Sequence, residues 1–204
     1  MALANYADLQ SSVGSWLHRS DLAANIPDFI LLAEERIARE LRVRKQVVNT
    51  TIPTVAGTQT ITLPTDFIEL ENITVIGVNP PRQLHVVTPE IMDEKFPAGY
   101  ITGMPVVYAL IGDTIQLGPT PDAVYSIGMD YYKRFDIAST DTNWLLTNHP
   151  SLYLFGALAE AAPFLQNDER APMWDAKFVA AMSSLNESDD SALRSGSAMR
   201  VRAL

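Results

Sequence analysis

Residues 142–165 read TNWLLTNHPSLYLFGALAEAAPFL, and this stretch decides how the rest of the chain must be arranged. It holds one carboxylate, Glu160, and one histidine, His149, among otherwise uncharged side chains. A membrane span needs roughly 20 consecutive apolar residues, whereas the run Leu152–Leu165 is shorter and is interrupted by Glu160 and Pro163. The pattern therefore predicts a helix that its neighbours enclose on nearly all sides.

Segments at both ends of the chain can supply those neighbours. Residues 6–17 have apolar side chains at helical spacing, which predicts a helix. Asn5 precedes them and is of a residue type that caps helices. A second helix is expected from Pro27, which suits a first helical turn, to about Arg44. A last helix starts near Asp168 and has one apolar stripe, formed by Trp174, Phe178, Ala181, Met182 and Leu185.

The middle of the chain changes from a helical period to a period of two. Alternation of apolar and polar side chains recurs through residues 46–135, with prolines between the runs. Gly112-Asp113 separates two such runs and predicts a β-hairpin. Residues 89–96 predict a short helix. This region is expected to form an antiparallel β module.

These patterns predict an α+β fold in which a four-helix bundle carries an inserted antiparallel β domain. Its expected parts are two N-terminal helices (residues 1–45), the β module (46–135), two C-terminal helices (136–187) and a flexible tail (188–204). The tail is rich in serine and aspartate and has few large apolar groups, so it cannot offset its own ordering entropy.

The overall composition narrows the classes of function. The chain has 204 residues and a net charge of −9, which argues against non-specific binding to nucleic acid phosphates. It contains no cysteine, which excludes disulfides, thiolate metal sites and cysteine nucleophiles. No basic segment followed by an apolar one appears near the N-terminus, so the cytoplasm of the producing cell is the expected compartment.

We find no sequence motif for catalysis, for phosphate binding or for a metal site. The histidines His18, His85 and His149 are far apart and lack ligand spacing. Ser151 beside His149 leaves a small serine hydrolase open as an alternative, although His149 is more simply a neighbour of a helix cap. We therefore expect neither an enzyme nor a cofactor.

Several charged and aromatic residues are candidates for contacts between subunits. Glu160 lies on the apolar helix, where a carboxylate usually meets an arginine across a helix or subunit interface, and Arg36, Arg39 and Arg42 are candidates. Trp144 is expected to be a core or interface anchor. The charged residues of the second helix predict a solvated or subunit-facing surface; they are Glu34, Glu35, Arg36, Arg39, Glu40, Arg42 and Arg44.

The order of several segments resembles the phage head-to-tail adaptor proteins of short-tailed phages, also called tail tubular protein A or gatekeeper-like. The resemblance rests on YADLQSSVGSWLHRSDLAANIPDFILLAEERIARELR at the start, LPTDFIEL, YALIGDTIQLGPTPD and MDYYKRF in the middle, and residues 142–182 at the end. It implies a structural virion protein that forms a ring of about twelve copies, as closed symmetry permits, below the portal.

The resemblance also implies partners and a location. The partners are the portal protein, other copies of the chain and a downstream, nozzle-like tail protein, with DNA passing through the lumen and no membrane contact. The protein would occupy the virion neck after assembly in the host cytoplasm. We expect the tail to dock on the portal through Arg194, Arg200 and Arg202. The alternative from a different class is a small-ligand or glycan-binding β module that uses Tyr108, Tyr125 and Tyr131, which otherwise pack on a sheet face.

Overall fold

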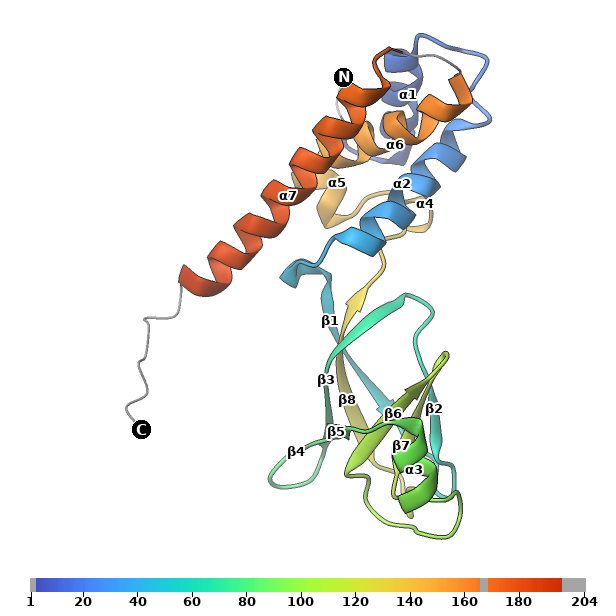
Figure 1. The fold of residues 1–204 in the computed structure, drawn as a ribbon, viewed down its shortest axis with the longest axis vertical. Coiled ribbons are helices and arrows are strands. Elements are labelled where there is room, and N and C mark those ends of the chain that lie inside the picture. Colours follow the sequence, from blue (N-terminus) through green and yellow to red (C-terminus); the bar gives the residue numbers. More distant parts are fainter. Residues whose placement is uncertain (1–2, 166–168, 196–204) are drawn as a thin grey trace. The chain divides into compact units, whose positions relative to one another are not determined.

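The computed structural model describes residues 3–165 and 169–195, and it is a mixed α+β fold (Figure 1). The chain divides into two compact units. The helical unit comprises residues 1–45 and 135–204, and the β unit comprises residues 46–134. Each unit has its own apolar core. Among the described residues, none of the helices is both long and apolar enough to cross a membrane.

In its described residues, the helical unit contains four longer α-helices and two short ones. Its helices are α1 (Tyr6–Leu17), α2 (Ile26–Glu40), α4 (Ile137–Thr140), α5 (Trp144–Asn148), α6 (Pro150–Leu165) and α7 (Ala171–Ser195). The Asn5 side chain accepts a hydrogen bond from the backbone N–H of Asp8 and caps α1. Pro27 stands in the first turn of α2, as predicted.

Helix α6 is the centre of this unit and contacts α1, α2, α5 and α7. Its buried residues point around most of the circumference and are Leu152, Tyr153, Leu154, Gly156, Ala157, Leu158 and Ala161. A β-carbon at Gly156 would lie 3.0 Å from the Phe178 ring and 3.1 Å from the Ala33 methyl. The missing side chain thus lets α2 and α7 approach α6 closely, and the enclosed apolar helix predicted from the sequence is present.

Two helix boundaries differ from the prediction. Helix α2 ends at Glu40 rather than near Arg44, because the chain becomes extended at Leu41. Leu41 and Val43 are both buried, so residues 41–43 alternate like a strand before the short 3-10 helix η1 (Arg44–Gln46). Helix α7 continues to Ser195 and so covers the first part of the segment expected as a flexible tail, while residues 196–204 lie outside the described residues.

The β unit consists of two four-stranded sheets. One has the order β1-β8-β3-β4 and the other the order β2-β7-β6-β5. The strands are β1 (Val47–Pro53), β2 (Thr60–Thr62), β3 (Phe67–Ile76), β4 (Arg82–Gln83), β5 (His85–Val86), β6 (Val107–Ile111), β7 (Thr114–Gly118) and β8 (Ser126–Lys133). Both sheets contribute to one apolar core, which includes Ile73 of β3, Ile115 of β7 and Ile127 of β8.

The predicted hairpin is present, because Ile111 of β6 pairs with Thr114 of β7. Gly112 at the turn has φ +55°, a conformation that favours glycine. The expectation of a purely antiparallel module is wrong at one ladder, since β5 and β6 are parallel. Helix α3 (Pro89–Lys95), also predicted, lies between them in the chain, and such a crossover returns the chain in the same direction.

Candidate functional site

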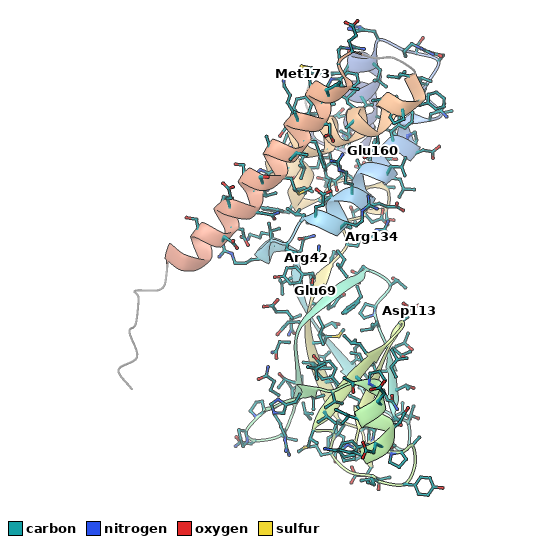
Figure 2. All side chains as sticks on the ribbon, in the orientation of Figure 1. Arg42, Glu69, Asp113, Arg134, Glu160 and Met173 are labelled. Carbon is teal, nitrogen blue, oxygen red and sulfur yellow. The ribbon has the colours of Figure 1, made fainter. Side chains whose placement is uncertain are left out.

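Two of the charged residues proposed for subunit contacts, Arg36 and Glu160, form an ion pair within the chain itself. Arg36 of α2 lies 2.7 Å from the Asp175 carboxylate of α7 and 3.6 Å from the Glu160 carboxylate of α6. Figure 2 shows Glu160 among the helices of this unit. Its guanidinium also lies 4.5 Å from the centre of the Phe178 ring. Partial burial opposes the charged form of Arg36, but the hydrogen bonds and charges of Asp175 and Glu40 together outweigh it and raise the pKa of Arg36.

This arrangement gives Glu160 a partner across a helix interface, which is one of the two options that the sequence left open. Arg36 connects three helices, because it reaches α6 and α7 from α2. A role of Arg36 or Glu160 between subunits stays a prediction. Arg39 is exposed on α2, and it forms no ion pair with a side chain in the described part of the chain.

Trp144 begins α5 and is half-buried against the helical core. The Trp144 and His149 rings pack in a T-shaped arrangement, with 5.3 Å between the ring centres. Arg194, Arg200 and Arg202, the predicted portal-binding residues, lie outside the residues whose side chains are described. Their role also stays a prediction.

Glu34 is a buried acidic residue that the sequence analysis assigned to the outer, charged face of α2. Its side chain is only 4% exposed. One carboxylate oxygen accepts hydrogen bonds from the Tyr153 hydroxyl at 2.7 Å and from the backbone N–H of Ile137 at 2.9 Å. Asn143 donates to the same Tyr153 hydroxyl at 2.7 Å. Burial and the neighbouring Glu34 charge raise the pKa of Tyr153. This network ties α2 and α6 to the segment that returns from the β unit.

The spacing of α2 contains the signal for this burial. Ile30, Ala33 and Ile37 form the buried stripe, and Glu34 follows Ile30 by four residues and precedes Ile37 by three. A charged residue at that spacing lies within the stripe rather than opposite it. The assignment of Glu34 to the outer face relied on its charge and was wrong. Its position in the sequence predicts the burial that the structure shows.

The last turns of α7 hold the extended segment that follows α2. The Asn186 side chain accepts from the Arg42 backbone N–H at 3.3 Å and donates to the Glu40 carbonyl at 3.3 Å. Asp189 accepts from both the backbone N–H and the Nε of Arg44, each at 2.9 Å. We call these contacts of Asn186 and Asp189 the clasp. Asp189 belongs to the segment 188–204 that the sequence predicted to be a flexible tail, and for this residue the prediction is wrong.

The described residues form no site for either alternative function, the serine hydrolase or the ligand-binding β module. Ser151 is exposed in the first turn of α6, and within the described residues no hydrogen bond joins it to His149. Tyr131 lies in the β core and donates to Asp66 at 2.8 Å, whereas the half-buried Tyr125 donates to Asp122 at 2.7 Å. In the described part of the chain, no cluster of three or more histidine and acidic residues has a geometry for a metal ion.

Comparison with known proteins gives a family for nearly the whole chain. The family model described as SU10 adaptor protein matches residues 4–202. This range includes both the helical and the β unit. Comparison with curated proteins finds no match.

Proposed function

The chain belongs to the SU10 adaptor protein family, which indicates a phage adaptor with a structural role, and on this premise we propose that it joins the head of a phage to its tail. In this proposal it is of the tail tubular protein A type, and copies form a closed ring of about twelve below the portal. The ring extends the DNA channel and docks the next, nozzle-like tail protein. The observation that carries the proposal is a family match that spans both units.

The helical unit supports the ring part of this proposal. We propose that α1, α2, α6 and α7 act as a four-helix bundle whose sides meet in the ring. A closed ring needs two different surfaces on each subunit. Helix α6 is mostly buried within its own chain, whereas α2 exposes Leu31, Leu32 and Arg39. These residues are therefore our candidates for one side of the subunit interface.

The charge of the chain supports passage of DNA. A net charge of −9 disfavours adhesion of phosphate to the ring, because only basic surfaces gain from counterion release. The proposed role requires no catalysis and no cofactor. It places the protein in the neck of the virion, after a period in the host cytoplasm before assembly.

We assign portal binding to residues 188–204. Three arginines in this segment, Arg194, Arg200 and Arg202, give it positive charge in an otherwise acidic chain. We propose that they meet acidic groups of the portal and that the segment orders further on binding.

Native mass spectrometry tests this function. The purified chain is measured alone and mixed with the portal ring encoded by the same genome. We expect a portal-bound species with about twelve copies, and its loss when residues 188–204 are deleted. A full-length chain that stays monomeric and does not bind the portal would overturn the adaptor proposal. A deletion variant that binds as well as the full chain would overturn only the assignment of the tail.

A further inference from the structure

Three loops at one end of the β unit form a braced surface. We call residues 54–58, 97–103 and 119–125 the loop platform. Strands β1 and β7 run into it and β8 leaves it, so it lies at the end of the strands opposite residues 46 and 134, where the chain enters and leaves the unit (Figure 1). The register supports this position, because Pro53 pairs with Ser126 beside the platform and Val47 pairs with Tyr132 at the other end.

Two buried threonines connect the loops. Thr54 donates through its hydroxyl to the Ala123 carbonyl at 3.1 Å, and the same oxygen accepts from the Tyr125 N–H at 2.8 Å. Thr120 accepts from the N–H of Gly103 at 2.9 Å and donates its own N–H to the Ile101 carbonyl at 3.0 Å. The platform is thus held by hydrogen bonds between loops that are distant in sequence.

A braced loop surface keeps its shape when it binds. Ordering a mobile loop costs binding free energy, and a loop that is already fixed avoids that cost. The backbone N–H of Gly57 donates to the Pro121 carbonyl at 2.8 Å, which adds a further connection between the first and third loops. The platform therefore has the pre-organisation expected of a binding surface.

Large apolar side chains project from this platform into solvent. Tyr100 is 87% exposed, Val124 is 69% exposed, and Val55 and Ile101 are also exposed. These side chains belong to loops that hydrogen bonds hold together. Large exposed apolar patches on proteins mark sites of interaction with another protein or a membrane.

The chemistry of the platform restricts the partner. Asp122 is its only charged residue, although the chain as a whole carries 24 acidic and 15 basic residues. The Asp122 carboxylate accepts a hydrogen bond from the Tyr125 hydroxyl at 2.7 Å. Nucleic acid and anionic lipid surfaces are attracted by lysine and arginine, which the platform lacks. An uncharged, apolar protein surface is the matching partner.

We infer that the loop platform is the docking surface for the next tail protein, through an uncharged, apolar surface of that protein. This inference rests on the proposed function, which requires one portal partner and one tail partner. The segment assigned to the portal belongs to the helical unit, whereas the platform belongs to the β unit. The two partners then use separate parts of the chain.

A matched pair of substitutions tests the inference. Val124→Asp places a charge in the platform, and Val86→Asp places the same charge on β5, where Val86 is 68% exposed. Both valines lie on the surface, so thermal melts are expected to match that of the unaltered chain. The full-length variants are mixed with the portal and the downstream tail protein of the same genome, and each bound protein is quantified by co-sedimentation and native mass spectrometry.

We expect Val124→Asp to bind the tail protein at least tenfold more weakly than Val86→Asp, with equal portal binding by both. Equal tail binding by the two variants would overturn the inference and leave the adaptor function intact. A Val124→Asp chain that loses self-association instead would also overturn it, because the platform would then contact a second copy. An unaltered chain that ignores both partners contradicts the proposed function itself.

Discussion

Glu34 shows how a single residue fixes the course of the chain in the helical unit. A carboxylate in an apolar interior is costly unless hydrogen bonds satisfy it. Here the Tyr153 hydroxyl and the Ile137 backbone N–H both donate to it. Ile137 directly follows the return from the β unit, and Tyr153 belongs to α6. The Glu34 carboxylate therefore fixes the position of the returning segment through the hydrogen bond from Ile137. An apolar residue at position 34 could not accept that bond.

We predict that Tyr153→Phe destabilises the helical unit by about 1–3 kcal/mol, because it removes a buried donor to Glu34 and the acceptor used by Asn143. Trp16, Trp144 and Trp174 all lie in the helical unit, so tryptophan fluorescence during urea unfolding reports this unit selectively. Ser183→Ala also removes a hydroxyl, from an exposed position on α7 of the same unit, and is expected to shift stability by less than about 0.5 kcal/mol. Equal effects of the two substitutions would show that the buried network contributes nothing.

At the scale of elements, α6 carries the packing of the helical unit. Its small residues let neighbouring helices approach, and its large ones fill the space between them. Leu158 is completely buried at the middle of the helix, whereas Phe164 on the same helix is 53% exposed. The two positions therefore separate the effect of a charge in the core from the effect of a charge on α6.

We predict that Leu158→Asp unfolds the helical unit or costs more than about 4 kcal/mol, because a carboxylate at that position has no partner. Phe164→Asp is the control, and its cost should be smaller by several-fold since its side chain is half in solvent. Circular dichroism measures the helix content of both variants, and tryptophan fluorescence measures their unfolding midpoints. A Leu158→Asp protein with native helix content and an unchanged unfolding midpoint would contradict the central position of α6.

The clasp makes a further prediction at this scale. Asp189→Ala removes the acceptor for the Arg44 backbone N–H, so the Arg44 amide should exchange with solvent at least about tenfold faster. The turn of α7 that contains Asp189 should become less helical. Glu187→Ala alters an exposed residue of the same turn and serves as the control. Residue-resolved hydrogen exchange gives the answer, and equal Arg44 exchange in the two variants would show that Asp189 does not hold the segment.

The elements that were predicted correctly are those with a strong local period. The helix at 6–17, the enclosed helix at 150–165 and the 112–113 hairpin depend on patterns within one segment. The end of α2 and the extent of α7 depend instead on side chains such as Asn186 that satisfy a backbone far away in sequence. The parallel β5–β6 pair likewise depends on the path of the whole chain. The loop platform also escaped prediction, because its bracing joins three separate loops.

At the scale of the whole molecule, the β unit is an insertion whose two ends are adjacent. Val47 near its start pairs with Tyr132 near its end, and paired residues in an antiparallel ladder have α-carbons about 4.5–5.5 Å apart. Among the described residues, those that form the helical core all lie before 46 or after 134. The clasp on Arg44 and the buried Phe135 fix the two points of connection within the helical unit. An insertion of this kind leaves the surrounding unit able to fold without it.

We therefore predict that a chain in which a short Gly-Ser linker replaces residues 46–134 folds into the helical unit alone. Tryptophan fluorescence should show one cooperative urea transition, because the shortened chain keeps Trp16, Trp144 and Trp174 and the complete helical core.

Under the proposed function the shortened chain should still bind the portal through residues 188–204, but it should not bind the downstream tail protein, since the loop platform is gone. The isolated β unit is the complementary control and should show the opposite preference. A shortened chain without a cooperative transition would mean that the helical core needs the β unit, and a shortened chain that still captured the tail protein would move that contact to the helices.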